Sequence, residues 1–509
     1  MSTTTATPTD SVNPKRWTSL FGLCLLTGLV WLTASDISIA LPTIGKDMGG
    51  SMDSLQWAVN GYFLTGSLII VGGKLGDLIG RRKLFVIGSG LLIVGSVVAM
   101  FSTGVTQLVI GRLIEGVGAA AILPTSLAMV AVGFPEEERA KAIGIWIATA
   151  WGGQGVGPLI GGALVQLVGW QSIFWINIPL GLFAVWLVLR TTPESSAEEA
   201  GGSLDIPGAV TLVGGIALIS FALVSTDTAS AGELGALAGG AVLLFALFVL
   251  VEKRSKDPLL PLSVFGRPLF MGSVIANLLA NVSFAAVVFL MSLFLQDVMG
   301  YGALKAGALL LPATATVLVV NVLGQRLTQN KIYRLPIALG MAFLAAGCID
   351  LTFLDRGTYM SLLPGFILVG IGVGLQITPA TELAIDSAGV GEGVASGAFK
   401  ATSMIGGSLG VAAATAVFQS VSSSDLSSKV KHGLGGGFDK THLLDIMTGS
   451  YEHLSRVPLE VIALTHSAFD DAAGLAMWVA AGAALIGIVT SVILLKGSKG
   501  FQGPGHGGH

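Results

Sequence analysis

The sequence predicts an all-helical membrane protein with about fourteen transmembrane helices. Of its 509 residues, 52% are hydrophobic and only 11% are charged, against about 25% charged in a typical soluble domain. Its 71 glycines are about twice the usual share, as expected where many helices pack closely inside lipid. Apolar runs of about 17–25 residues, long enough to cross a bilayer, recur along the chain. A soluble core could not absorb so much apolar sequence, so lipid must cover it.

Charged residues and turns bound these runs, and the spans can be placed in order. The first follows Lys15 and Arg16 and is longer than the apolar part of a cleavable signal peptide, so we expect it to span the membrane. Cys24 and Cys348 lie inside such runs and read as small buried hydrophobic residues. The expected spans are 18–41, 55–75, 84–101, 107–132, 142–164, 172–190, 206–224, 234–251, 269–294, 305–324, 335–353, 360–383, 394–421 and 472–495.

Lysine and arginine set the expected orientation. With the N-terminus in the cytoplasm, most of the 27 basic residues fall in cytoplasmic segments, as the positive-inside rule requires. Arg112 and Lys400 are the basic residues that lie inside expected spans, several residues from either end. Both termini are therefore expected in the cytoplasm, in a multi-pass protein of the plasma membrane. The net charge of −3 argues against a nucleic-acid partner.

Two polar segments interrupt the series of spans. Residues 191–205 form an acidic linker that marks a boundary after the sixth span. Residues 422–470 form a long outside loop, in which the spacing of apolar residues over 442–469 favours an amphipathic helix at the outer face. A solvated loop containing Pro458 remains the alternative. The tails 1–16 and 497–509 are expected in the cytoplasm, the histidines of the second tail are given no metal role, and no metal or cofactor is expected.

Charged residues occur at depth in two spans. Arg112 and Glu115 lie in the fourth span and Asp36 in the first, and each such charge costs about 2.5–3.5 kcal/mol on insertion scales. Arg112 and Glu115, at spacing i, i+3, share one helix face. Asp36 and Arg112 are both expected roughly 8 Å below the outer face, so the three can form one cluster. One arginine cannot fully compensate two carboxylates, so one of these should exchange protons; an ion-pair network that only holds the two spans together is the alternative.

The loop after the second span, Gly73-Lys74-Leu75-Gly76-Asp77-Leu78-Ile79-Gly80-Arg81-Arg82-Lys83, combines small residues for a tight turn, one acceptor and a basic triplet. It resembles the G-x-L-a-D-r-x-G-r-k signature of the major facilitator superfamily. Span four is similar to that superfamily's R-x-x-Q-G-x-G-A-A, with Glu115 in place of glutamine. Trp170 and residues 174–179 resemble the start of its sixth span. Span five resembles its antiporter motif, G-x-x-x-G-P-x-x-G-G, at Gly153, Gly157, Pro158, Gly161 and Gly162.

In this order the motifs resemble the fourteen-helix drug:proton antiporters of that superfamily. The resemblance implies a six-helix bundle at 17–190, a linker with two inserted helices at 191–268 and a second six-helix bundle at 269–496, with alternating access by rocking of the bundles. We assign proton coupling to Asp36, Arg112, Glu115 and Glu382. The expected conformational latch consists of Gly73, Asp77, Gly80, Arg81 and Arg82.

Three positions depart from the family pattern. Thr33 stands where the first span of the family carries an aspartate, and Asp36 lies one turn nearer the outside. Lys400 and Ser403 replace an asparagine and an arginine in span thirteen, and Lys400 is expected to extend to the cytoplasmic surface. In the second-half copy of the loop, at 324–334, a glutamine stands where the aspartate would be, so this copy is expected to lack the latch.

The predicted function is export of lipophilic drugs or toxic compounds, cationic ones included, in exchange for protons, by a monomer that also contacts membrane lipid. The absence of a G-x-x-x-x-G-K-[ST] sequence argues against an ATPase. Export or flipping of a membrane lipid or lipophilic metabolite is the nearest alternative, and a membrane receptor or scaffold that transports nothing is another. Substrate is expected between the bundles, against aromatic and methionine side chains with a carboxylate for charge balance. The residues chosen by their spans are Trp57, Trp146, Trp151, Phe284 and Met291.

Overall fold

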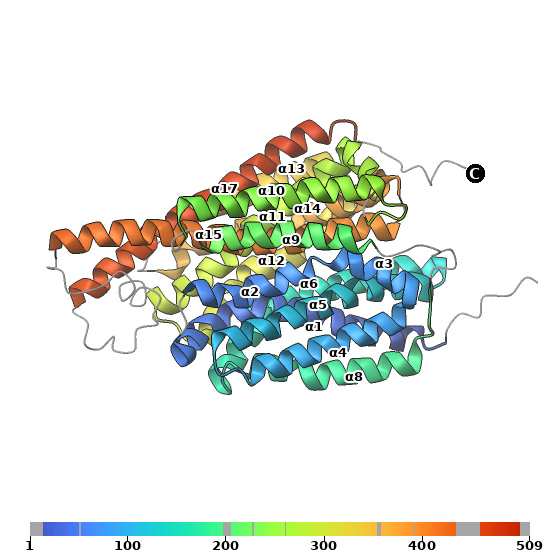
Figure 1. Ribbon diagram of the computed structural model, residues 1–509, viewed down its shortest axis with the longest axis horizontal. Coiled ribbons are helices and arrows are strands. Elements are labelled where there is room, and N and C mark those ends of the chain that lie inside the picture. Colours follow the sequence, from blue (N-terminus) through green and yellow to red (C-terminus); the bar gives the residue numbers. More distant parts are fainter. Residues whose placement is uncertain are drawn as a thin grey trace, which may run out of the picture.

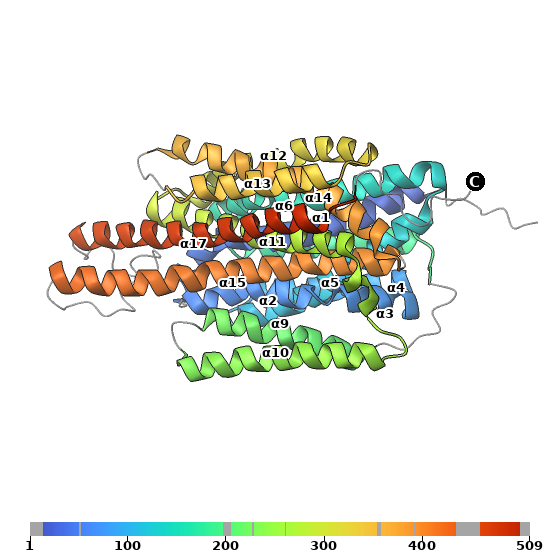
Figure 2. The same ribbon diagram turned by 90° about the horizontal axis from the view of Figure 1, so that it is seen from above.

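The computed structural model describes residues 14–49, 52–196, 205–225, 229–259, 261–353, 358–390, 392–433 and 459–498, and every regular element in these ranges is a helix. The long helices run side by side along one axis (Figure 1, Figure 2). Helix α1 (Arg16–Met48) begins, and α17 (Leu459–Leu494) ends, at the same end of this axis. We call this end the terminal face and the opposite end the far face.

The first group of helices contains the chain up to Thr191. Helix α1 packs against α6 and α8, and α5 packs against α2 and α4. Helices α2 and α3 are separated by Ser67 and Leu68 and meet at a bend of 43°. After α1 the bounds are α2 (Met52–Gly66), α3 (Ile69–Ile79), α4 (Arg81–Met100), α5 (Val105–Gly133), α6 (Glu136–Leu167), α7 (Ser172–Trp175) and α8 (Asn177–Thr191).

The second group of helices begins at Pro268, where proline occupies the first turn of α11 and its missing N–H leaves no bond unmade. Helices α12, α13 and α14 pack together, and α11, α15 and α17 pack together beside them. The bounds are α11 (Pro268–Leu293), the π-helical turn η2 (Phe294–Val298), α12 (Ala303–Gln329), α13 (Arg334–Asp350), the short turn η3 (Tyr359–Ser361), α14 (Leu363–Ala388), α15 (Glu392–Gly433) and α17.

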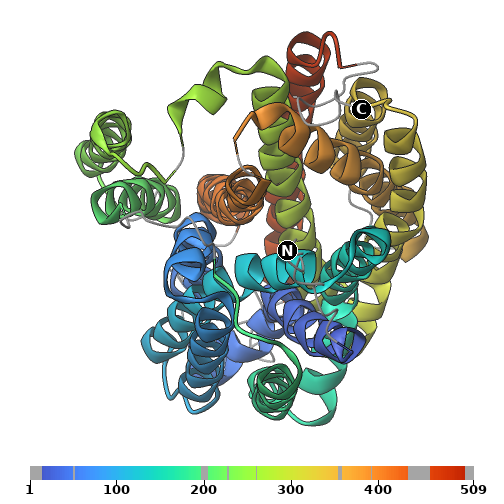
Figure 3. The same cartoon turned by 90° about the vertical axis from the view of Figure 1, so that its right-hand side faces the viewer.

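Helices α9 (Ile206–Val224) and α10 (Ala231–Arg254) form a separate pair, followed by the short turn η1 (Leu262–Gly266). The side chain of Asp205 caps α9 by accepting the N–H of Gly208 at 2.8 Å, and Ser230 and Glu233 form a capping box at the start of α10. Seen along the helix axis, the pair lies to one side of the molecule, next to α15 and the first group (Figure 3). It therefore flanks the two groups without separating them.

Among the described residues, eleven helices are long and apolar enough to cross a membrane, and the bent pair α2–α3 makes a twelfth span if it is counted as one. Helices α6 and α13 do not meet the same criteria of length and composition. Helix α13 has only 17 residues, and α6 carries a charged first turn and a glycine-rich middle. The structure thus gives a multi-pass helical membrane protein, while the number fourteen remains a prediction.

The last two long helices differ from the expected spans. Helix α15 continues to Gly433 and α17 already begins at Leu459, so both ends of the predicted loop 422–470 are helical. Figure 2 shows both helices projecting beyond the others at the far face. The boundaries follow local signals rather than hydropathy, since α15 ends at a glycine-rich stretch and α17 starts directly after Pro458. The predicted amphipathic helix falls mostly on residues 434–458, outside the described residues.

Candidate functional site

Arg112 is completely buried in the first group of helices. Its Nη1 donates to Glu115 Oε2 at 2.6 Å, its Nε to the carbonyl of Ala58 at 2.7 Å and its Nη2 to the carbonyl of Thr33 at 3.1 Å. The guanidinium also lies 4.4 Å from the ring centroid of Tyr62, a distance suited to a cation–π contact. One side chain thereby joins α1, α2 and α5.

Glu115 extends this arrangement into a closed ring. Its Oε1 accepts a hydrogen bond from Ser96 Oγ of α4 at 2.5 Å, and Ser96 Oγ accepts one from Asn177 Nδ2 of α8 at 3.0 Å. Asn177 Oδ1 accepts from Thr33 Oγ1 at 3.2 Å, and the carbonyl of Thr33 receives Arg112. A buried ion pair is tolerated only when its remaining polar atoms are satisfied, and this ring satisfies both carboxylate oxygens of Glu115.

Asp36 lies one turn beyond Thr33 on α1 and is also buried. Its Oδ2 has no hydrogen-bond partner in the described part of the chain. The charges of Arg112 and Glu115 both act on its carboxyl group. At this level α6 approaches closely, because a Cβ on Gly161 would lie 2.7 Å from the Cβ of Asp36. Asp36 is therefore a buried carboxylate beside an ion pair that is already complete.

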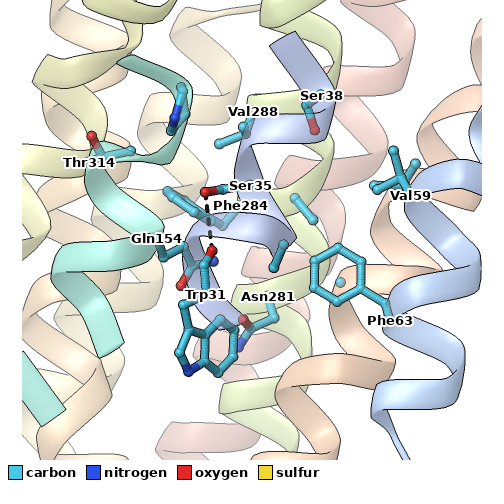
Figure 4. A pocket seen from close by; sticks show the side chains of 15 residues that line it. Trp31, Ser35, Ser38, Val59, Phe63, Gln154, Asn281, Phe284, Val288 and Thr314 are labelled. Carbon is cyan, nitrogen blue, oxygen red and sulfur yellow. Dashed lines mark hydrogen bonds between the residues drawn. The ribbon is translucent and has the colours of Figure 1, made fainter. Parts of the chain in front are cut away.

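A small central pocket lies between the two groups of helices (Figure 4). Its volume of about 30 Å³ is enough for one or two water molecules. The first group contributes Trp31, Ser35 and Gln154, and the second contributes Asn281 and Phe284. The lining is apolar with a few amides and hydroxyls, and none of the described residues that form it is charged. The wall that α1 gives to the pocket is one residue away from Asp36.

A second, larger space, the terminal-side cavity, continues from Trp31 toward the terminal face. Its volume is about 420 Å³, within the range of ligand sites, roughly 300–1,000 Å³. Apolar side chains of α3, α5 and α6 form most of the wall, and α14, α15 and the segment after α10 complete it. Gly73 lines it, and at the terminal face it reaches Asp77 and Arg81. The two groups are thus separated in their terminal half.

At the far face the two groups contact each other directly. Ser292 Oγ and Gln296 Nε2 of the second group donate to the carbonyls of Ser38 and Ile39 on α1, at 2.8 and 3.1 Å. The Lys46 ammonium lies 3.9 Å from the Asp297 carboxylate. Gln166 Oε1 accepts the N–H of Leu304 at 3.0 Å. The space between the groups is therefore closed at the far face.

The glycines of the α6 motif explain how closely the helices approach. Three of them, Gly153, Gly157 and Gly161, face Gly28, Ser35 and Asp36 of α1, and a Cβ on any of them would collide with that helix. Gly162 faces the carbonyl of Ala303 on α12 in the same way, and Gly307 of α12 faces the carbonyl of Pro158. The motif thus packs α6 against α1 on one side and against α12 on the other.

The signature loop lies at the junction of α3 and α4. Asp77 Oδ1 accepts from Arg81 Nε at 2.9 Å, and Gly80, with a φ of 109°, makes the turn that other residues rarely adopt. Glu194, from the segment after α8, accepts the backbone N–H groups of Arg82 and of the next residue at 2.9 and 3.2 Å. A carboxylate at the start of a helix is favoured by the helix dipole. The loop is thereby attached to the linker that leads to α9.

The predicted substrate residues are divided between several places. Phe284 lines the central pocket and Trp146 lines the terminal-side cavity. Trp57 packs against α9 instead, with its ring centroid 6.0 Å from that of an α9 phenylalanine. Trp151 and Met291 are in the lining of neither space.

The four residues assigned to proton coupling also do not all lie in one place. Asp36, Arg112 and Glu115 come together, whereas Glu382 is exposed on α14 in the second group. Sequence reasoning missed two members of the ring, Ser96 and Asn177. Each is a polar residue inside a predicted span, and this is the only signal that could have identified them.

Two groups of membrane-length helices that enclose a central pocket, open toward one face and closed at the other, define the class of membrane transporters. Residues 23–411 match the Major Facilitator Superfamily, and the chain belongs to this family. It is 33% identical over 416 residues to the tetracenomycin C resistance and export protein of Streptomyces glaucescens, which covers 80% of this chain and 76% of that protein. It is also 33% identical over 413 residues to the quinolone resistance protein NorB of Staphylococcus aureus, covering 79% and 88% of the two chains.

Solved structures share the fold at low sequence identity. A bacterial homologue of the human lysosomal transporter Spinster, in an inward-facing and unoccupied conformation, matches with a TM-score of 0.60 at 15% identity, over 95% of this chain and 98% of that one. The human organic anion transporter MFSD10 matches with a TM-score of 0.59 at 14% identity, over 94% and 100% of the two chains. At such identities the likeness concerns the fold alone.

Proposed function

We propose that this protein is a proton-coupled antiporter of the fourteen-helix type that exports lipophilic drugs across the plasma membrane, as a monomer with both termini in the cytoplasm. The names of its relatives, an exporter of tetracenomycin C and a quinolone resistance protein, support drugs as the substrate class. The distribution of lysine and arginine supports a cytoplasmic terminal face. On this orientation the terminal-side cavity faces the cytoplasm, where an exporter takes up its substrate.

The observation that carries proton coupling is the position of Asp36. It is a buried carboxylate with one oxygen that accepts no hydrogen bond from the described residues, next to an Arg112–Glu115 pair that already satisfies the arginine. Burial disfavours a charged carboxylate whose polar atoms are not all paired, and in this proposal Asp36 is the group that takes up the proton in this state. Movement that brings Arg112 to Asp36 favours the ionised form and releases the proton.

Helix α1 links this proton site to the substrate site. Trp31 of this helix lines the terminal-side cavity, where the substrate is taken up, and Asp36, five residues further along α1, lies against α6 and near Arg112. Because a movement of α1 that shifts Trp31 also shifts Asp36, substrate occupancy and the protonation of Asp36 depend on each other. Such reciprocal dependence is what antiport requires.

The two helix groups act in this proposal as rigid bundles that rock against each other. The far-face contacts and the open terminal-side cavity correspond to the inward-facing state. Here Asp77 pairs with Arg81 of its own loop, and the latch residues Gly73 and Gly80 allow the turn to approach the second bundle when the terminal face closes.

The test is dye efflux from proteoliposomes under an imposed pH gradient, with and without a protonophore. Asp36→Asn should abolish gradient-driven efflux and leave dye binding intact, whereas Glu115→Gln, which keeps a hydrogen-bonding side chain at this place, should retain part of the transport. Full gradient-driven efflux in Asp36→Asn would place the proton site elsewhere, with Glu115 and then Glu382 as the next residues to substitute. Competition by neutral lipids, but not by dyes, would indicate a lipid exporter instead.

A further inference from the structure

Four charged side chains line the terminal-side cavity: Lys74, Asp77, Arg81 and Lys400. Two of them, Asp77 and Arg81, form an ion pair with each other at 2.9 Å. The Lys74 ammonium donates to the backbone carbonyls of Asp257 and Pro258. This leaves Lys400, for which the described residues provide neither an ion-pair partner nor a hydrogen-bond acceptor.

Lys400 belongs to the wall of the cavity rather than to its rim. It lies on α15 between Gly397 and Met404, which are one turn to either side. Gly397 packs against Ile70 of α3, and Met404 packs against Gly66 at the end of α2. The lysine therefore occupies the side of α15 that faces the first bundle, at the bend between α2 and α3, and is only partly exposed.

The surroundings of Lys400 are apolar. The same cavity is lined by Ile69, Leu123, Leu127, Ile143 and Trp146. An ammonium group in such a place has lost much of its hydration, and an opposite charge would restore the lost interaction energy. A positively charged ligand would find no free carboxylate in the described lining, because its one carboxylate, Asp77, is already paired with Arg81.

We propose that the cavity selects anionic amphiphiles: compounds with an apolar body and a carboxylate, sulfonate or acidic phenol whose negative charge pairs with Lys400. This inference rests on the proposed export function, and it replaces the expectation from the sequence that cations are exported by a preference for anions. The volume of about 420 Å³ suits a molecule of drug size. Trp31 and Trp146, on the first bundle, provide aromatic surface for the apolar body.

The experiment compares two dyes that share one scaffold. Anilinonaphthalene-1-sulfonate carries a sulfonate and N-phenyl-1-naphthylamine does not. Their binding to the full-length protein in phosphatidylcholine nanodiscs is measured by quenching of tryptophan fluorescence, with empty nanodiscs as the blank. Lys400→Met should weaken binding of the sulfonate roughly tenfold or more, the worth of one charge-assisted hydrogen bond. The neutral dye should change by less than about twofold, and Lys400→Arg should keep the preference of the parent.

Equal effects of Lys400→Met on both dyes, or no effect on either, would overturn the proposal. Replacing phosphatidylcholine by phosphatidylglycerol separates the two sources of negative charge. Unchanged sulfonate binding supports a small-molecule ligand, whereas loss of binding in the parent but not in Lys400→Met shows that an anionic lipid occupies the site and overturns the small-molecule assignment.

The two proposals fail in different ways. If the parent binds the sulfonate dye through Lys400 but no dye leaves proteoliposomes under a pH gradient, the export function fails and the anion site stands. If neutral and cationic dyes are exported equally well by the parent and by Lys400→Met, and the sulfonate is not preferred, export stands and the anion site fails.

Discussion

The two bundles are both built of packed helices but bury different polar groups. In the first bundle, Arg112 and Glu115 form a buried ion pair next to the carboxylate of Asp36. In the second bundle, Asn277 Nδ2 takes the corresponding role as a hub, with the carbonyl of Phe399 at 3.1 Å and two hydroxyl groups of α15 at 2.9 Å. Amides and hydroxyls can hold helices together, but they do not exchange protons at ordinary pH. This difference is why the proposed proton coupling is assigned to the first bundle.

The two copies of the signature loop also differ in the contacts that their polar and charged residues make. In the first, Asp77 and Arg81 form an ion pair. In the second, Gln329 is exposed at the end of α12, and Arg334 donates to the carbonyl of Val492 at 2.8 Å instead. The first bundle thus carries the buried ion pair, while the second supplies packing and half of the pocket. Four substitutions test this division, in order of their expected effect.

The largest effect is expected for Arg112→Leu. It leaves Glu115 buried without its counterion, which typically costs about 3–5 kcal/mol, so the melting temperature of the purified protein should fall strongly and efflux should cease. In the double variant Arg112→Leu/Glu115→Leu no charge remains uncompensated, and stability should largely return while transport stays absent. A double variant that transports would mean that the ion pair only holds the bundle together.

A smaller effect is expected where the bundles meet. Gly307→Ala places a methyl group against the carbonyl of Pro158, and such overpacking costs about 1–3 kcal/mol. The variant should weaken closure at the far face and slow efflux. Gly152→Ala on α6 is the matched control, because a Cβ there meets nothing within 4 Å. Thermal unfolding and initial efflux rates that are equal in the two variants would contradict the assignment of this contact.

Asn277→Ala tests the second bundle. Loss of this buried amide should lower stability by about 1–3 kcal/mol, because the carbonyl and hydroxyl oxygens that accept from it are left without that donor. The curve of efflux rate against the imposed pH gradient should have the same shape as the curve of the parent protein. If Asn277→Ala shifts that pH dependence as Asp36→Asn does, the two bundles share the proton pathway and the proposed division of roles between them is wrong.

The smallest change in stability is expected for Asp77→Asn, since half-exposed ion pairs contribute at most about 1 kcal/mol. The effect of Asp77→Asn should appear in the rate of transport, because the proposed latch forms during the transport cycle. The variant should insert into the membrane and melt like the parent but export dye several-fold more slowly. Gln329→Ala, in the second copy of the loop, should change neither the melting temperature nor the efflux rate. Efflux by Asp77→Asn at the parent rate would refute the latch.

The sequence alone was sufficient for the membrane class, the family and the pairing of Arg112 with Glu115. The pairing follows from the i, i+3 spacing on one helix, which is a local property. Ser96 and Asn177 were missed because their roles depend on how α4 and α8 are rotated about their axes, and hydropathy gives no information on rotation in an apolar span.

Lys400 and the ends of the last helices show the same limit of prediction from sequence. A lysine near the end of a span is expected to reach the surface, but α15 packs against the α2–α3 bend and places it in the cavity wall. Helices α15 and α17 extend past the expected spans because helix boundaries respond to glycine and proline, whereas span limits were drawn from hydropathy. Both differences arise from packing or capping that single-residue polarity does not encode.

The size of the central pocket has a consequence for the membrane itself. It holds about 30 Å³, room for one or two water molecules, between an open cavity on one side and tightly packed backbones on the other. A hydrated ion would have to lose nearly all of its hydration shell to pass through this pocket, at a cost of many kcal/mol. In a membrane that carries a voltage, this conformation should therefore oppose the leakage of ions, so that the electrical resistance of the bilayer is kept between transport cycles.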